Sequence, residues 1–259
     1  MRLTVFASGS TGNCSLVSGA GAHILVDAGI SAKRITAGLA SVGLAPTSLD
    51  GIFITHEHSD HIKGLAVLMK HGPVPVFAPG AVAEYLRRAL PGVLPFLHTL
   101  TPPEPVELGE MRVIPFPTPH DVRQSVGYRV EAEDTALFFA TDTGCVTEEM
   151  LCRLAGADAA LMEANHDVDM LRHGPYPPEL QQRILSDRGH LSNAECTWLA
   201  AVAAHQGTRH IVLGHMSREN NTPELALRTV RRGLEGTDAV LYAAPELGCL
   251  SVEVSPCFV

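Results

Sequence analysis

A short polar stretch, "THEHSDH", directly follows an apolar run and concentrates the groups best suited to chemistry in this chain. It places His56, His58, Asp60 and His61 within six residues. Imidazole and carboxylate groups are ligands for borderline divalent metals such as zinc, with manganese or iron as alternatives. A solvated turn would also use Asp and Ser, but it has no reason to prefer three imidazoles at this spacing. The stretch therefore predicts a metal site.

The local geometry of this stretch predicts two neighbouring sites. An extended chain after Thr55 would carry His56 and His58 on the same side, while Asp60 and His61 fall where the chain turns into a helix. Four groups are too few for two ions that also hold reactive water. Further ligands are expected from three later residues that each stand at the end of an apolar run: His120, Asp142 and His215.

The order and approximate spacing of these residues resemble the metallo-β-lactamase superfamily over almost the whole chain. The resemblance implies two divalent metal ions, zinc or manganese, with iron as a further option. The first ion would be held by His56, His58 and His120. The second would be held by Asp60, His61 and His215. Asp142 would bridge the two ions, and a shared hydroxide would attack the substrate, because two cations lower the pKa of bound water toward neutrality.

Two further polar residues resemble the phosphodiesterase branch of that superfamily, in which a Glu and a His form a pair beside the metals, as in ribonuclease Z. Glu163 ends an apolar run, and His190 precedes a helix whose start is marked by the capping box of Ser192 and Glu195. An alkoxide leaving group needs a positioned acid, which the resemblance assigns to His190. The alternative is an ordinary residue at a helix start. We predict catalytic roles for Asp60, Glu163 and His190.

Two absences narrow the resemblance further. The segment between Asp142 and His215 is too short for the inserted domain of the β-CASP nucleases, and no Gly/Pro-rich arm resembles the tRNA-grasping arm of many ribonuclease Z enzymes. The motifs that remain, including "ASGSTGNCSLV", "EANHD" and "GHLSN", resemble the YycJ (WalJ)-type metallohydrolases of bacteria. That branch implies 5′-to-3′ exonuclease activity on DNA and an association with mismatch repair, with repair partners unknown.

Residues near these motifs are candidates for substrate binding. They are Ser8, Ser10, Asn13, His166, Asn220 and Asn221. The first three belong to "SGSTGNCS", which forms either an anion-accepting turn or a tight turn between strands. The two later asparagines either contact substrate or shape their loop. Asp27, in the turn "DAG", is expected to support the metal-binding loop through a hydrogen bond.

Two other functions fit parts of the pattern. A thioester or lactone hydrolase of the glyoxalase II type would use the same metals, but it leaves Glu163 and His190 without a role. A non-catalytic metal-binding sensor would keep the metals as structure, although structural zinc sites normally leave no position open. Both alternatives can be separated from a nuclease by assay.

Strand patterns alternate with helix patterns along the chain, which predicts an α/β fold to position these residues. Apolar, β-rich runs predict strands at 3–6, 23–29, 51–55, 74–79, 111–116, 125–130, 136–142, 159–165, 210–215 and 239–244. Helical patterns occupy 31–43, 62–72, 81–90, 147–156, 191–207 and 223–236.

An internal repeat indicates how these elements pack. The succession of strand, Asp-x-Gly turn, helix, strand and polar loop that begins at residue 23 recurs from residue 136. Each half forms a sheet that must cover one apolar face. The predicted fold is a four-layer α-β-β-α sandwich, with two mixed sheets inside and helices outside, and with the polar loops meeting along one edge.

Composition bounds the remaining properties. Hydrophobic residues make up 46% of the 259 residues and charged residues 18%, without a linker, so a single domain over 1–259 is expected. The net charge of −9 argues against a broadly basic nucleic-acid-binding surface, but bound cations could still draw a phosphate to the site.

No signal peptide or membrane-spanning run is visible, so we expect a cytoplasmic protein. The six cysteines form no Cys-x-x-Cys pair and are expected to be reduced. Assembly into a homo-oligomer is left open.

Overall fold

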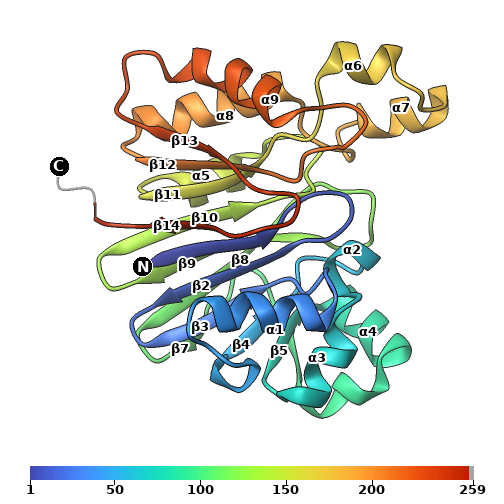
Figure 1. Cartoon of the computed structure of the whole chain (residues 1–259), viewed down its shortest axis with the longest axis vertical. Coiled ribbons are helices and arrows are strands. Elements are labelled where there is room, and N and C mark those ends of the chain that lie inside the picture. Colours follow the sequence, from blue (N-terminus) through green and yellow to red (C-terminus); the bar gives the residue numbers. More distant parts are fainter. Residues whose placement is uncertain (257–259) are drawn as a thin grey trace.

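The fold is built on two seven-stranded sheets packed face to face, as seen in the computed structural model, which describes residues 1–256 (Figure 1). The first sheet has the strand order β14-β1-β2-β3-β4-β5-β6. Its strands are β1 (Arg2–Ala7), β2 (Cys14–Gly19), β3 (Ala22–Val26), β4 (Gly51–Phe53), β5 (Val76–Pro79), β6 (Leu97–Leu100) and β14 (Leu250–Glu253). The strands from β3 to β6 are parallel, and the other neighbours are antiparallel.

The second sheet has the order β13-β12-β11-β10-β9-β8-β7. Its strands are β7 (Val106–Leu108), β8 (Met111–Pro117), β9 (Val126–Ala132), β10 (Thr135–Ala140), β11 (Ala159–Glu163), β12 (His210–Gly214) and β13 (Val240–Ala243). Here β10 to β13 are parallel, and β7 to β10 are antiparallel. Both sheets are therefore mixed, as predicted.

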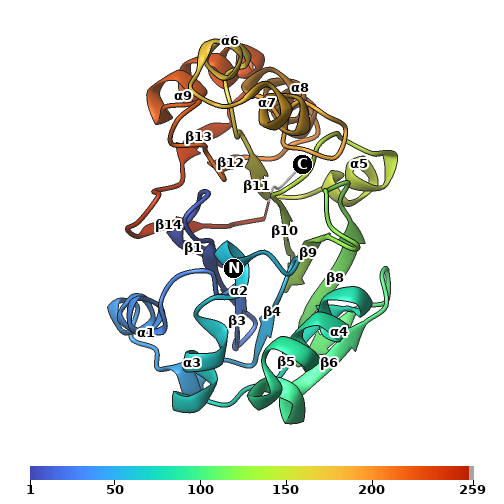
Figure 2. The same cartoon turned by 90° about the vertical axis from the view of Figure 1, so that its right-hand side faces the viewer.

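Helices cover the outer face of each sheet and complete the four predicted layers (Figure 2). On the first sheet these are α1 (Ala32–Ser41), α3 (Leu65–His71) and α4 (Gly80–Ala89), which share one apolar core with its strands. On the second sheet they are α5 (Glu148–Leu154), α8 (Asn193–His205) and α9 (Pro223–Arg231). A third core, which includes Phe53, Tyr128 and Phe139, fills the space between the sheets and supports our proposal that residues 1–259 form a single domain.

The internal repeat corresponds to one structural unit in each sheet. The unit β3-α1-β4 pairs two parallel strands in the first sheet, and β10-α5-β11 does the same in the second. Each unit follows its first strand with an Asp in the left-handed region, Asp27 at φ 62° and Asp142 at φ 56°. The predicted capping box at the start of α8 is also present, since Ser192 and Glu195 each accept a hydrogen bond from the backbone of the other.

Several elements were not predicted from the sequence. They are β2, β6, β7, β14, α6 (Val168–His173), α7 (Pro178–Ile184) and three 3₁₀ turns, Pro46–Ser48, Pro91–Phe96 and Arg232–Leu234. The turn into a helix that was expected at Asp60 and His61 is present as α2 (Ser59–Ile62). Residues 174–177, between α6 and α7, include two prolines and a glycine, a composition that indicates a loop. The two short helices on either side were therefore not predicted.

Two other predictions concern the chain as a whole. Cys14, Cys145, Cys152, Cys196 and Cys249 are free thiols, and Cys257 lies outside the described residues. None of the helices within residues 1–256 combines the length and the apolar composition that crossing a bilayer requires.

Candidate metal centre

Strand direction in the second sheet brings four polar residues to one edge. β8 and β10 both run antiparallel to β9, and β10, β11 and β12 are parallel, so these four strands end on the same side. Glu163 is the last residue of β11, Asp142 and His215 follow β10 and β12, and His120 follows β8. Residues separated by up to 95 positions are therefore placed side by side by sheet topology.

The first sheet delivers the "THEHSDH" loop to the same edge. The loop leaves β4, and α2 begins directly after His58, so Asp60 and His61 lie on a short helix as predicted. The backbone of the neighbouring "DAG" turn approaches this helix closely. A Cβ on Gly29 would lie 1.6 Å from the carbonyl oxygen of Asp60, so only glycine allows this approach.

Asp27 contacts the "THEHSDH" loop through hydrogen bonds, as the sequence predicted. Its Oδ2 lies 2.7 Å from Nδ1 of His61, and its Oδ1 accepts a hydrogen bond from the backbone N–H of Thr55 at 2.9 Å. Both Asp27 and His61 are almost completely buried. The Nδ1 atom of His61 is thereby occupied, and its Nε2 faces the other candidate ligands.

Removing the Asp27 carboxylate is expected to weaken metal binding by about 10- to 100-fold, because the ring of His61 loses the group that orients it. Asp27→Gly is the suitable variant, since glycine accepts the positive φ of this position without strain. Metal affinity would be measured by competition with a chelating dye. Asp50→Ala, which removes an exposed carboxylate near His23, is the matched control. Equal affinities in Asp27→Gly and the unaltered protein would contradict this role.

Ligand-type atoms gather in four groups at this edge, each with all its atoms within 4.8 Å of one another. Two of these groups coincide with the ligand sets that the resemblance implied. One group is His56, His58 and His120, and the other is Asp60, His61 and His215. The structure thus brings all six proposed ligands together around Asp142.

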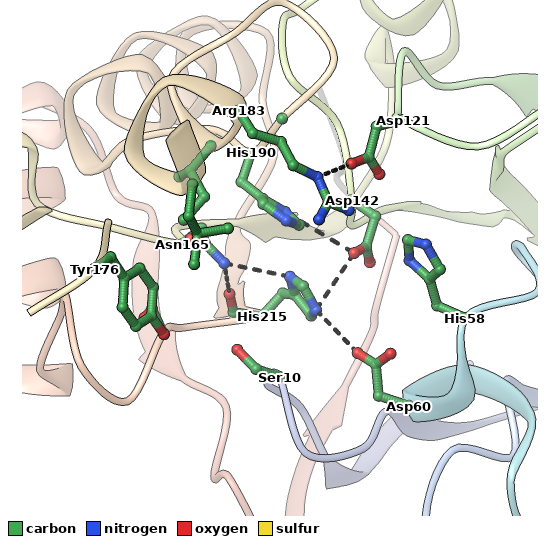
Figure 3. Close-up of a pocket in the computed structure, with 14 residues that line it drawn as sticks. Ser10, His58, Asp60, Asp121, Asp142, Asn165, Tyr176, Arg183, His190 and His215 are labelled. Carbon is green, nitrogen blue, oxygen red and sulfur yellow. Dashed lines mark hydrogen bonds and ion pairs between the residues drawn. The ribbon is translucent and has the colours of Figure 1, made fainter. Parts of the chain in front are cut away.

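Asp142 lies between the two groups, and its side chain points into the cluster (Figure 3). Its Oδ1 lies 4.0 Å from Nε2 of His56, 3.8 Å from Nε2 of His120 and 3.4 Å from Nε2 of His215. Its Oδ2 lies 3.3 Å from Nε2 of His61. A carboxylate in this position can contribute an oxygen to each of two cations.

The chemistry of the cluster fits divalent cations. Nε2 of His120, Oδ2 of Asp142 and Nε2 of His215 are buried and have no hydrogen-bond partner. Leaving such atoms unsatisfied is costly, and a bound ion would satisfy them. Burial and the neighbouring His61 and His120 rings lower the pKa of His56 well below its ordinary value, which keeps the imidazole in the neutral form that binds metals.

Backbone strain is concentrated in the same place. Five non-glycine residues within 1–256 have positive φ, and three of them are Asp27, Asp142 and His215. Ala20 and Glu133 are the other two, each in the turn of a hairpin. Asp and His tolerate the left-handed region better than most residues, but it is still uncommon. Strained positions cluster at functional sites, because the surrounding structure must hold them there.

Glu163 forms the predicted pair with His190 and also contacts a candidate metal ligand. Its Oε1 lies 2.8 Å from Nδ1 of His190 and 2.7 Å from Nδ1 of His215. Burial opposes the ionised forms, but the attraction within the pair prevails. It holds the pKa of Glu163 below its usual range and raises the pKa of His190. With Nδ1 of His190 held in this way, its Nε2 is the atom available to a substrate.

The six candidate substrate residues occupy different environments. Only Ser10 lines the cavity beside the cluster. The other five are buried: Ser8, Asn13, His166, Asn220 and Asn221.

Four of the five buried candidates have side-chain hydrogen bonds that favour structural roles, whereas both ring nitrogens of His166 are buried without a hydrogen-bond partner among the described residues. Ser8 accepts a hydrogen bond from the backbone N–H of His215 at 2.8 Å, and Asn13 lies 3.1 Å from Nε2 of His61. Asn220 interacts with Ser217, and Asn221 donates to the carbonyl oxygen of Ala164. These contacts favour the alternative that Ser8, Asn220 and Asn221 shape their turns and loops, and substrate binding by these residues stays a prediction. Their side chains shape the loops that carry the candidate ligands.

The structure also adds residues that the sequence interpretation missed. Asn165, Tyr176 and Arg183 line the cavity, together with Asp121, which directly follows His120. Arg188 donates to the carbonyl oxygens of His120 and Val122, which fixes the loop that carries His120. Two local signals were available, since Asp121 directly follows a proposed ligand and Asn165 lies in the motif "EANHD" between Glu163 and His166.

Comparisons with known proteins agree with this geometry. A family model described as a β-lactamase superfamily domain matches residues 22–216. The exodeoxyribonuclease YycJ of Bacillus anthracis is 38% identical over 238 residues, which cover 91% of this chain and 89% of that protein. The exodeoxyribonuclease WalJ of Streptococcus pneumoniae is 37% identical over 243 residues, with 92% and 89% covered. The crystal structure of the metallo-β-lactamase fold protein YhfI from Bacillus subtilis superimposes with a TM-score of 0.74 at 15% identity, over 97% of this chain and 99% of that one.

Proposed function

Because this chain belongs to the β-lactamase superfamily, we propose that it is a metal-dependent phosphodiesterase that removes nucleotides from the ends of DNA. The single observation that carries the proposal is the Glu163–His190 pair, which places an imidazole beside the metal cluster. The names of the YycJ and WalJ relatives support DNA as the substrate. Digestion from the 5′ end and a role in mismatch repair, with unknown partners, remain predictions.

Seven residues would hold the metals. We propose that His56, His58 and His120 bind one divalent cation, that Asp60, His61 and His215 bind the other, and that Asp142 contacts both. When bound, zinc or manganese would lower the pKa of a water molecule and neutralise charge on the phosphate. The same nitrogen and oxygen ligands also accept iron.

The chain's own residues supply the remaining chemistry. Hydrolysis adds water to phosphorus and breaks the bond to the leaving sugar oxygen, which needs a proton. His190 borders the cavity, and its Nε2 can donate that proton while Glu163 holds the ring from the other side. Because Glu163 also contacts His215, it aligns the acid with the metal cluster.

Metal dependence gives the direct test of this proposal. After chelation, the protein should not digest end-labelled single- or double-stranded DNA. Added Mn²⁺ or Zn²⁺ should restore digestion, and the first product should be the mononucleotide released from the 5′ end. S-lactoylglutathione, a thioester, should not be hydrolysed. Thioester hydrolysis without DNA digestion would support the glyoxalase II alternative, and metal binding without either activity would support a sensor.

Metal binding should also stabilise the fold, because it relieves the unpartnered buried atoms of the cluster. A ligand at about 100 times its Kd adds about 2.7 kcal/mol to the free energy of unfolding. In a chain of this size, this corresponds to a rise of roughly 5 to 10 °C in melting temperature. Differential scanning fluorimetry with and without a chelator would measure it, and an unchanged melting temperature would count against a preformed metal site.

A further inference from the structure

A cavity of about 360 Å³ lies beside the metal cluster. One wall carries candidate metal ligands, including His58, Asp60 and Asp142. The facing wall comes from the segment of α6 and α7, which contributes Tyr176 and Arg183 (Figure 3). This volume lies near the lower end of the range for small-ligand pockets, roughly 300 to 1,000 Å³. It suits one unpaired nucleotide better than a duplex.

Arg183 is the only lysine or arginine among the described residues that line this cavity. Its Nε donates to the carboxylate of Asp121, and no protein group in residues 1–256 accepts a hydrogen bond from its two Nη atoms. Figure 3 shows the guanidinium reaching into the space between His190 and Asp121. The opposite oxygen of Asp121 lies 3.3 Å from Nε2 of His120, so Asp121 fixes this cation at a set position beside the metal cluster.

Tyr176 lies across the cavity from His58 (Figure 3). Its side chain is partly exposed, and its hydroxyl group makes no hydrogen bond to any described residue. The Tyr176 carbonyl accepts a hydrogen bond from Gln181, which fixes the backbone at this point. The ring on this fixed backbone borders the cavity and can offer an apolar face to a ligand.

We propose that Arg183 and Tyr176 form a nucleotide subsite. Arg183 binds the phosphate next to the scissile one, and Tyr176 stacks on the base of the nucleotide that links these two phosphates. The proposal rests on the proposed phosphodiesterase function. Every nucleotide adds a phosphate, and the metal cluster can neutralise only the one being cleaved, so the next phosphate needs a cation of the protein. A guanidinium matches phosphate oxygens in a bidentate geometry, and aromatic rings stack on any base.

The competing explanation is that the Arg183–Asp121 ion pair only fastens α7 to the loop that carries His120. Fastening would affect every substrate equally. A subsite would affect only those substrates that carry the recognised group, so substrates that lack the base or the charge distinguish the two explanations.

The base contact is tested with Tyr176→Ala and Tyr176→Phe on single-stranded DNA in which the nucleotide between the scissile phosphate and the neighbouring internal phosphate is either normal or abasic. We expect Tyr176→Ala to lower kcat/KM roughly tenfold or more on the normal strand, mainly through KM, since stacking contributes on this scale. The loss should shrink to about twofold on the abasic strand. Tyr176→Phe keeps the ring and should recover most of the loss. Tyr85→Ala, at an exposed tyrosine on α4, is the control.

The phosphate contact is tested with Arg183→Gln and Arg183→Lys on strands in which the phosphate next to the scissile one is either normal or an uncharged methylphosphonate. Arg183→Gln should lose roughly tenfold or more on the charged strand and much less on the neutral one, because charge-assisted hydrogen bonds contribute on this scale. Arg183→Lys keeps the charge and should lose less than Arg183→Gln. Arg112→Gln, which breaks a surface ion pair on β8, is the control.

The outcomes separate the subsite from the proposed function. Equal losses on the modified and normal substrates, or a lower metal content in these variants, would overturn the subsite. Hydrolysis of bis(p-nitrophenyl) phosphate by the unaltered protein tests the metal centre without any nucleotide. If the unaltered protein cleaves neither this ester nor DNA with metal present, the proposed function itself fails.

Discussion

Replacing Asp142 by Asn is expected to lower phosphodiester hydrolysis by at least about a thousandfold. The amide keeps the size of the carboxylate and tolerates the left-handed backbone at φ 56°, so the fold should survive. However, the amide presents only one oxygen and no negative charge, and so it cannot contact two cations as Asp142 can. Metal ions supply several kcal/mol of charge stabilisation, and about 4 kcal/mol corresponds to a factor of about a thousand.

Metal content and activity must be measured together in this variant. We expect the number of bound ions, determined by atomic emission, to fall from two per chain to one or fewer. Asp134→Asn is the matched control, since Asp134 is exposed in the turn before β10, at the opposite end of the strand that leads to Asp142. Two bound ions and undiminished hydrolysis in Asp142→Asn would refute the bridging role.

His190→Ala is expected to slow DNA cleavage by about a hundredfold or more while leaving the bound metal in place, because general acid catalysis contributes on this scale. The loss should be smaller for bis(p-nitrophenyl) phosphate, whose nitrophenolate leaves without a proton. His205→Ala removes an exposed histidine near the end of α8 and serves as the control. An equal loss on both substrates, or a loss of metal, would exclude His190 as the acid.

Glu163→Gln provides a second measurement on the same pair. Because Oε1 of Glu163 lies within 2.8 Å of a nitrogen on both His190 and His215, this variant should lose metal affinity as well as activity. His190→Ala should lose activity alone. Retention of full metal affinity in Glu163→Gln would show that His215 does not depend on this carboxylate.

The sequence by itself determined the α/β class, the layered sandwich and the membership of the candidate metal cluster. These features depend on local chemistry, namely the apolar period of each strand, the Asp-x-Gly turns and the polar residues directly after strands. Since parallel strands in one sheet end at the same edge, a residue such as His215 could be assigned to the edge without knowledge of any contact.

Only the tertiary structure decided many of the contacts that the other polar side chains make. It buried Ser8, Asn220 and Asn221, let Glu163 hold two histidines, and folded the segment around Tyr176 and Arg183 into a wall of the cavity. These contacts join residues far apart in the chain, and they depend on how loops pack after the sheets have formed. The periodicity of a sequence records which face of an element is buried, but it carries no information about such pairings.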